Sequence, residues 1–195
     1  LPVAGAELLH PDVEQGDGRL VLDQRHGGVE QLADHQQLTG ALLEAPEVLR
    51  ARTALWFDTV AARADVDAAR IAAIGYCFGG KCTMELARSG RDVKAAVSYH
   101  GLLTTHAPAK PGDIKGEIVA WCGALDPFGP PEETAAFRVE MIAAGADWQI
   151  TEFGKVAHGF TDPQAEGGMP GIAYDLLADR MSWAGTVLLL EHVFA

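Results

Sequence analysis

The sequence predicts an α/β fold in which a mostly parallel central sheet is covered by helices on both faces. From about residue 50 onward, short apolar runs alternate with stretches that have helical spacing. The apolar runs are continuous, as in strands that are buried on both faces of a parallel sheet. One such run, residues 71–74, passes through a glycine-rich turn directly into a helix-forming stretch. Alternating strands and helices of this kind predict a series of βα units.

The expected elements follow one another closely. Pro130 and Pro131 mark the start of one helix, and Gly90 and Gly145 mark the ends of two. In chain order we expect a helix over 49–64, a strand over 71–76, a helix over 79–89, a strand over 93–98, a loop over 101–116, a strand over 118–122, a helix over 132–144, a strand over 148–153 and a helix over 172–194.

Residues 75–80 read Gly-Tyr-Cys-Phe-Gly-Gly and stand at a predicted strand-to-helix turn. They match a nucleophile elbow, G-x-C-x-G, with Cys77 in the place that serine usually takes. Such a turn exposes the sulfur at a helix N-terminus, where the helix dipole favours the thiolate. A buried, inert cysteine beside a glycine-rich packing point explains the motif alone equally well. The rest of the chain must therefore decide between the two interpretations.

An acid and a histidine follow two later strands. Asp126 comes just after the apolar run at 118–122, and His158 lies in the loop after the run at 148–153. The carboxyl ends of parallel strands open on one crevice, so both side chains are expected near Cys77. Nucleophile, then acid, then histidine is the chain order of the α/β-hydrolases. We therefore predict that Cys77, Asp126 and His158 form a catalytic triad.

These motifs resemble the dienelactone hydrolases (carboxymethylenebutenolidases), a cysteine-using branch of the α/β-hydrolases. The resemblance runs from about residue 50 to 195 and is carried by the segments IAAIGYCFGGKCTMELARSG, AAVSYHG, GALDPF, AAFRVEMIAAGADWQITEFGKVAHGFTDP and AYDLLADRMSW. It implies the three-layer α/β-hydrolase-like fold, with Cys77 as nucleophile, His158 as its partner and Asp126 orienting the histidine. It also implies that the backbone amide of Phe78 is one donor of the oxyanion hole. No cofactor is implied.

The chemistry expected of these residues is that of a cysteine esterase. A thiolate attacks an ester or lactone carbonyl and forms a thioester, which divides the hydrolysis into two easier steps. The histidine protonates the leaving alkoxide and then activates water, while the acid fixes its tautomer. We expect a small ester or lactone as substrate. Thr161-Asp162-Pro163 follows the histidine, and an acid there disfavours an anionic lactone such as dienelactone.

Residues 1–49 do not match the family pattern, in contrast to the core at 50–195. Only a short strand at 19–23 and a helix at 30–43 are expected there, and neither the second oxyanion donor nor the acidic residue that contacts the cysteine in the family is evident. We therefore expect a shortened or rearranged family member. The alternative is a catalytically impaired remnant that serves as a binding or thiol-redox module.

Composition limits the remaining possibilities. With 195 residues, 48% hydrophobic, the chain suits one globular domain. The net charge of −12 argues against nucleic acid or an anionic membrane as partner. Three cysteines without a C-x-x-C pair fit a reduced, cytoplasmic setting. The seven histidines form no ligand-spaced set, so no metal is expected. The sequence carries no signal for oligomeric state.

Five further side chains receive structural roles in this interpretation. Cys82 and Cys122 are expected in the core. Lys81 and Arg88 are expected on the solvated side of the helix that follows the elbow. His100 ends a strand, where packing or capping explains it better than a place in the crevice.

Overall fold

The computed structural model describes residues 39–165 and 169–195. Within them, four parallel strands form one sheet in the order β1-β2-β3-β4. The strands are β1 (Ala72–Tyr76), β2 (Ala95–Tyr99), β3 (Glu117–Gly123) and β4 (Trp148–Phe153), and the helices are α2 (Pro46–Ala61), α3 (Phe78–Ala87), α4 (Pro131–Ala144) and α5 (Leu176–Val193). Residues 39–44 are also helical.

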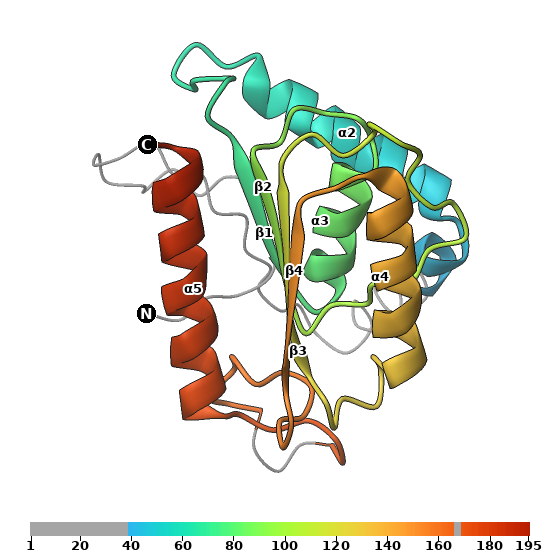
Figure 1. The fold of residues 1–195 in the computed structure, drawn as a ribbon, viewed down its shortest axis with the longest axis vertical. Coiled ribbons are helices and arrows are strands. Elements are labelled where there is room, and N and C mark those ends of the chain that lie inside the picture. Colours follow the sequence, from blue (N-terminus) through green and yellow to red (C-terminus); the bar gives the residue numbers. More distant parts are fainter. Residues whose placement is uncertain (1–38, 166–168) are drawn as a thin grey trace, which may run out of the picture.

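The described elements form three layers (Figure 1). Helix α5 covers one face of the sheet, and α2, α3 and α4 lie on the other. Alternate residues of β2 serve the two faces: Val97 packs with Leu189 of α5, whereas Ala96 packs with Met84 of α3 and Phe137 of α4. This double burial is the reason for the continuous apolar runs in the strands. The expectation of an α/β-hydrolase-like fold with a parallel sheet and helices on both faces is confirmed.

The strands, α3 and α4 agree with the sequence-based boundaries to within two residues, whereas α2 lies three residues earlier than the expected 49–64 and the last helix starts later than expected. The expected start was residue 172, and α5 begins at Leu176 because Asp175 caps it, its carboxylate accepting a hydrogen bond from the Ala178 amide at 2.8 Å. The preceding residues pair with the loop around His158 instead, through the Ala173 amide and the His158 carbonyl. Residues 172–175 are therefore bonded to the loop that carries His158 and are not part of the helix.

The expected division at residue 49 falls inside α2, which begins at Pro46. Leu42 and Leu49 pack with Cys82 of α3, and Phe78 lies against this cluster. The chain just before residue 50 therefore helps to support the helix that follows Cys77. The expected strand at 19–23 and most of the expected helix at 30–43 lie outside the described residues. The division into a segment 1–49 and a core 50–195 stays a prediction.

We expected Lys81 and Arg88 to be solvated, and this expectation is wrong. Both side chains are buried, and each residue is only 2% exposed. Their charges are matched by Glu85, whose carboxylate lies 2.8 Å from Lys81 and 3.0 Å from Arg88. Glu85 also pairs with Arg50 of α2 at 2.7 Å, and Arg88 pairs with Glu140 of α4 at 2.7 Å. Helical spacing alone could not reveal this network, because two of the partners come from other helices.

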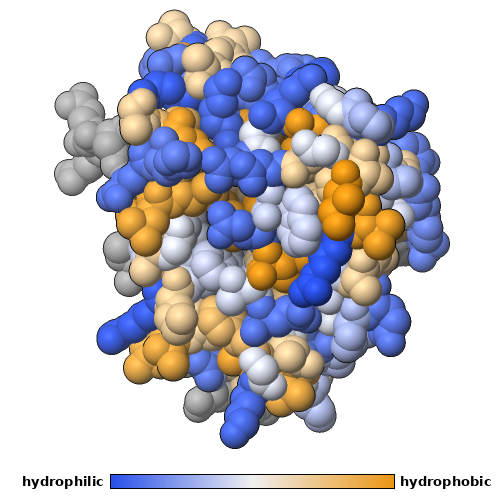
Figure 2. All heavy atoms as spheres, in the orientation of Figure 1, coloured by the Kyte–Doolittle hydropathy of each residue, from blue (hydrophilic) through white to orange (hydrophobic). Residues whose placement is uncertain are grey.

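The surface in Figure 2 mixes polar and apolar side chains on the face shown. In the part of the chain that the structure describes, no helix combines the length and the apolar character needed to cross a membrane.

Candidate active site

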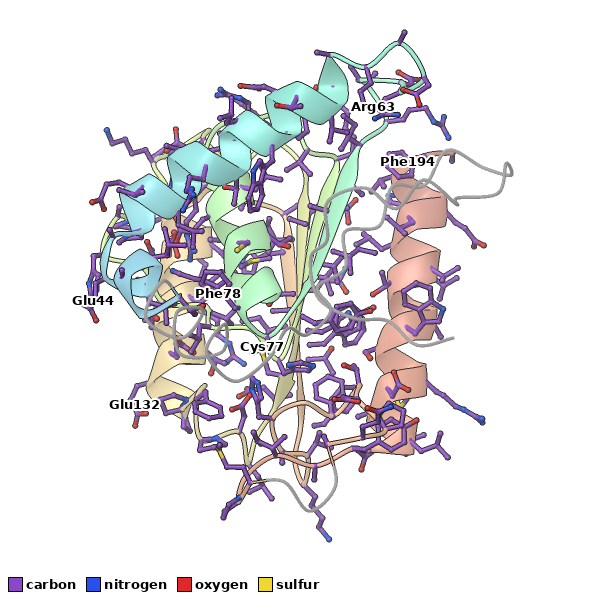
Figure 3. The ribbon with its side chains drawn as sticks, turned by 180° about the vertical axis from the view of Figure 1, so that it is seen from behind. Glu44, Arg63, Cys77, Phe78, Glu132 and Phe194 are labelled. Atoms are coloured by element: carbon purple, nitrogen blue, oxygen red, sulfur yellow. The ribbon has the colours of Figure 1, made fainter. Side chains whose placement is uncertain are left out.

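Cys77 stands at the turn between β1 and α3. Its backbone has a φ of 52° and a ψ of −120°, a conformation that L-residues rarely adopt. Its amide donates to the carbonyl of Tyr99 at the end of β2, at 3.0 Å. A Cβ on Gly75 would lie 2.0 Å from the carbonyl oxygen of Gly79, so the turn closes only with glycine there. Cys77 is exposed, at the end of the sheet where α3 begins (Figure 3).

Asp126 lies in the turn that follows β3, at the same end of the sheet. Its side chain is 6% exposed, and its Oδ1 accepts a hydrogen bond from the backbone amide of Phe128 at 2.8 Å. That bond fixes the carboxylate, so that the second oxygen, Oδ2, is presented to His158. Glu132, at the start of α4, marks this end of the molecule in Figure 3, whereas Arg63 and Phe194 mark the opposite end.

His158 lies between the other two side chains. Its Nδ1 donates to Oδ2 of Asp126 at 2.8 Å, and its Nε2 lies 3.3 Å from the sulfur of Cys77. The backbone of His158 is held on both sides, because its amide donates to the Gly171 carbonyl and its carbonyl accepts from the Ala173 amide, each at 3.0 Å. A continuous hydrogen-bonded chain therefore runs from a buried carboxylate to an exposed thiol.

The charges and hydrogen bonds of these three side chains favour a thiolate–imidazolium pair at Cys77 and His158. Burial alone would raise the pKa of Cys77, but the hydrogen bond and charge of His158, together with the Phe78 amide, lower it below the ordinary value. Burial alone would lower the pKa of His158, but its bonds to Asp126 and Cys77 raise it to about 9. Each partner thus stabilises the ionised form of the other. A thiolate of this kind is a nucleophile near neutral pH.

Phe78, the first residue of α3, supplies the amide next to the sulfur. This amide helps to lower the pKa of the Cys77 thiol. An amide that reaches the sulfur also lies close to any carbonyl oxygen that the sulfur attacks. The place of Phe78 is thus compatible with its expected part in an oxyanion hole.

Comparison with known proteins gives the family. The sequence model of the dienelactone hydrolase family matches residues 6–194, nearly the whole chain. The chain belongs to the dienelactone hydrolase family. The expectation of a family of ester and lactone hydrolases is thereby confirmed, and the match includes most of the residues that precede 50.

Solved structures of this family resemble the chain closely. The structure titled m3DLH is 37% identical, with a TM-score of 0.76, and the match covers 86% of this chain and 70% of that one. The dienelactone hydrolase-like promiscuous phosphotriesterase P91, from metagenomic libraries, is 32% identical with a TM-score of 0.73, and the match covers 89% of this chain and 70% of P91.

Curated relatives differ in length. An uncharacterized protein of Caenorhabditis elegans, K02A2.1, is 35% identical over 134 residues, which are 67% of this chain and 84% of the relative. Enterobacterial relatives with the provisional name carboxymethylenebutenolidase match over only 40 to 48% of their own length. This dienelactone hydrolase family chain therefore spans less than half of those longer proteins.

Two rings contact the imidazole of His158 in this family member. Phe128 and His100 meet it at near-perpendicular angles, with ring centroids 4.9 Å and 4.8 Å away. Phe128 is 45% exposed and forms part of the rim, whereas His100 is buried. We expected a packing or capping role for His100 and did not single out Phe128. The sequence contained a signal for both residues. Phe128 lies two residues after Asp126 in the turn that follows β3, and His100 directly follows β2, the strand beside β1.

The other cysteines take the structural places that we expected. Cys82 is buried and Cys122 partly buried, both against apolar neighbours. Burial raises the pKa of each thiol to about 12, so neither competes with Cys77 as a nucleophile. In residues 39–165 and 169–195, no group of three or more His, Cys, Asp or Glu side chains is arranged to hold a metal ion.

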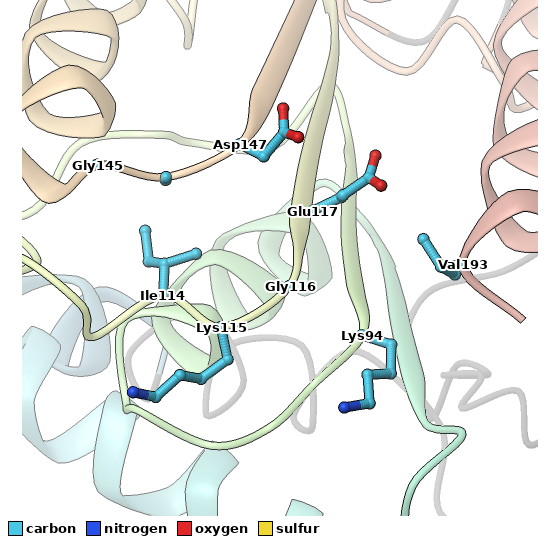
Figure 4. A pocket seen from close by; sticks show the side chains of 9 residues that line it. Lys94, Ile114, Lys115, Gly116, Glu117, Gly145, Asp147 and Val193 are labelled. Atoms are coloured by element: carbon cyan, nitrogen blue, oxygen red, sulfur yellow. The ribbon is translucent and has the colours of Figure 1, made fainter.

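A separate hollow lies at the opposite end of the strands (Figure 4). It is bordered by Lys94, Lys115, Glu117 and Asp147, and includes none of the triad residues. Both lysines are already bonded, Lys94 to Asp92 and Lys115 to the Gly112 carbonyl, each at 2.7 Å. Each ammonium already has an acceptor within the chain, and the hollow holds no candidate catalytic residue, so the end with Cys77 remains the candidate active site.

Proposed function

We propose that the chain hydrolyses small neutral esters or lactones, with Cys77 as nucleophile, His158 as acid and base, and Asp126 as the residue that orients His158. The observation that carries this proposal is the hydrogen-bonded chain from Asp126 through His158 to an exposed Cys77 sulfur, at 2.8 and 3.3 Å. Membership of the dienelactone hydrolase family supports it independently.

In the first step the Cys77 thiolate attacks the carbonyl carbon, and the carbonyl π electrons move to oxygen. The amide of Phe78 lies beside the sulfur and stabilises the oxyanion, the role that we expect of it. When the tetrahedral intermediate collapses, the bond to the alkoxy oxygen breaks and the His158 imidazolium protonates it. The products are a thioester on Cys77 and an alcohol, which in a lactone stays attached to the acyl group.

In the second step, His158 is neutral and takes a proton from water as that water attacks the thioester. The second intermediate releases the carboxylic acid and returns the sulfur as a thiolate beside an imidazolium. Asp126 accepts a hydrogen bond from Nδ1–H throughout, which keeps Nε2 facing the reacting atoms. The pair that begins the cycle is thus restored, with one water consumed.

The substrate class that we infer rests on a charge that follows His158 closely in the sequence. Asp162 lies four residues after His158 on the same loop, is exposed, and holds its turn through bonds to the amide of Gln164 and the carbonyl of Gly159. A carboxylate on the substrate would meet this negative charge. We therefore infer a preference for neutral esters or lactones over dienelactone.

A second candidate activity is the hydrolysis of phosphotriesters. It is favoured by the 32% identity to P91, whose title names it a promiscuous phosphotriesterase. The same thiolate would attack phosphorus and expel an aryloxide, and water would then cleave the phosphorus–sulfur bond. Turnover of an aryl dialkyl phosphate beyond one equivalent supports this activity, and a single equivalent of released phenol shows that the enzyme stops after the first step.

The test of the main proposal is hydrolysis of 4-nitrophenyl acetate by the wild type, Cys77→Ala and the matched cysteine control Cys122→Ala. We expect Cys77→Ala to lose saturable turnover while Cys122→Ala keeps it. Iodoacetamide labelling, located by peptide mass spectrometry, is measured alongside. Fast labelling of Cys77 without turnover would instead establish the catalytically impaired binding or thiol-redox module.

A further inference from the structure

We propose that His100 is a positioning residue, which holds His158 in the orientation that directs Nε2 at the sulfur of Cys77. The inference goes beyond the assignment of the triad, although it rests on the proposed function in that Cys77 and His158 are taken as the reacting pair. It joins three observations at the end of β2: a backbone link to Cys77, a ring contact with His158, and a hydrogen bond to the loop that carries His158.

The backbone at the end of β2 supports the turn that holds Cys77. The carbonyl of Tyr99, directly before His100, accepts the Cys77 amide at 3.0 Å. The amide of His100 donates to the carbonyl of Trp121 on β3 at 2.8 Å, and the residue has a φ of 39°. Cys77 and His100 are the two non-glycine residues with positive φ in the described chain. Neighbouring strand ends thus turn sharply side by side, which points both side chains into the site.

The side chain of His100 reaches the loop that carries His158. Its Nε2 shares a hydrogen bond with the hydroxyl of Thr161 at 2.9 Å, and Thr161 lies three residues after His158. The same ring lies 4.8 Å from the His158 ring and 5.2 Å from the Phe160 ring, both near perpendicular. His100 is 6% exposed and Phe160 is fully buried. A buried ring therefore touches the imidazole on one side and anchors its loop on the other.

The charge state of His100 suits this place. Burial, and then the charge of His158, lower the pKa of His100 to about 3, against a smaller opposite effect of Asp126. Tyr76, a third ring near His100, is neutral because burial raises the pKa of its hydroxyl. Nδ1 of His100 is buried without a hydrogen-bond partner in the described residues. An uncharged imidazole can lie against the His158 imidazolium without repelling it.

Histidine combines two contacts that phenylalanine and asparagine supply only singly. Phenylalanine at position 100 keeps a ring against His158 but cannot bond to Thr161, and asparagine keeps a polar group but loses the ring. If either contact is missing, the His158 ring can tilt away from the sulfur. Since a displacement of about 1 Å in a reacting group can lower a rate by about 10², we expect a loss of tenfold to a hundredfold in kcat.

The experiment compares His100→Phe, Thr161→Val, the double variant and the conservative Thr161→Ser. The control is Thr186→Val, which removes another buried threonine hydroxyl, the one bonded to Tyr99 at 2.5 Å and to Trp121 at 3.1 Å on the other face of the sheet. For each protein we measure kcat and KM for 4-nitrophenyl acetate, the melting temperature, and the rate of Cys77 alkylation by iodoacetamide as a function of pH.

We expect His100→Phe and Thr161→Val to lower kcat by about tenfold or more with little change in KM, and to move the alkylation midpoint of Cys77 to higher pH. The double variant should be no worse than the stronger single one, because both changes break the same link. Thr161→Ser should restore kcat and the midpoint, and Thr186→Val should change only the melting temperature.

The proposal is overturned if His100→Phe and Thr161→Val lower the melting temperature while kcat and the alkylation midpoint stay at wild-type values, or if their effects on kcat multiply independently. Should His100→Phe fail to fold, the comparison of Thr161→Val with Thr161→Ser gives the same decision. The alkylation readout does not depend on turnover. A chain without esterase activity would refute the proposed function and still show whether His100 sets the state of the thiol.

Discussion

Nε2 of His158 lies 3.3 Å from Sγ of Cys77, and the proposed chemistry depends on this pairing of a loop histidine with a thiol at a helix start. The two residues come from different strand ends. Their approach is fixed by Asp126 on one side of the imidazole and by the turn at Cys77 on the other.

The pH dependence of ester hydrolysis should report this pair. The pKa of Cys77 is lowered, and that of His158 is raised to about 9, so the thiolate–imidazolium form exists between the two values. We expect a bell-shaped kcat/KM: the rate falls at acid pH as Cys77 gains a proton, and falls again near pH 9 as His158 loses one. Initial rates from pH 5 to 10 check this. An unchanged rate through pH 9 and above would contradict the assignment of the acid.

Replacing Asp126 by asparagine should affect kcat much more than KM. Asparagine can present its NH₂ to Nδ1, which favours the wrong tautomer of His158 and removes the charge that stabilises the imidazolium. We expect kcat to fall by about 10²–10⁴. Steady-state kinetics measure the effect, with circular dichroism to verify folding. A loss of less than threefold would show that Asp126 does not orient His158.

The turn at Cys77 depends on a close backbone contact at Gly75. An added Cβ would lie 2.0 Å from the Gly79 carbonyl oxygen, which the helix start holds in place, so Gly75→Ala should cost about 1–3 kcal/mol or more in the free energy of unfolding. The matched control is Gly154→Ala, where no described atom lies within 4 Å of the added carbon. Urea denaturation compares the two. Equal stabilities would mean that the turn can open without cost.

Among the ion pairs of the described residues, we expect the buried pairs around Glu85 of α3 to contribute most to the stability of the fold. Glu85 is fully buried and pairs with Lys81, Arg88 and Arg50. Removing its charge leaves the buried Lys81 without its carboxylate partner and Arg88 with Glu140 alone, so Glu85→Gln should lower the free energy of unfolding by about 3–5 kcal/mol. The exposed pair of Asp58 and Arg91 is the control, and Asp58→Asn should change stability little.

The same network gives a pH dependence of stability. Burial would raise the pKa of Glu85, but the charges of Arg88 and Lys81 lower it below the ordinary value of 4.5. The stabilisation is therefore fully present above about pH 4.5 and is lost as the pH falls through the lowered pKa. Melting curves of the wild type and Glu85→Gln should converge in acid. A stability gap that stays constant down to pH 3 would contradict this account.

The positions of the three candidate catalytic residues could be predicted from the sequence more accurately than those of the residues that pack around them. Cys77, Asp126 and His158 could be predicted because each follows an apolar strand, and parallel strands place their carboxyl ends together. Arg88 could not be placed correctly, since its partner Glu140 is on another helix and its burial depends on tertiary packing. The positioning contact of His100 was missed for the same reason, because Thr161 becomes its neighbour only in the folded chain.

The most direct test of the central claim is intact-protein mass spectrometry after rapid mixing with 4-nitrophenyl acetate and an acid quench. We expect a transient gain of one acetyl group that peptide mapping places on Cys77, with no gain in Cys77→Ala under conditions where Cys122→Ala matches the wild type. Turnover without any acetylated Cys77, or acetylation on a different residue, would contradict the account.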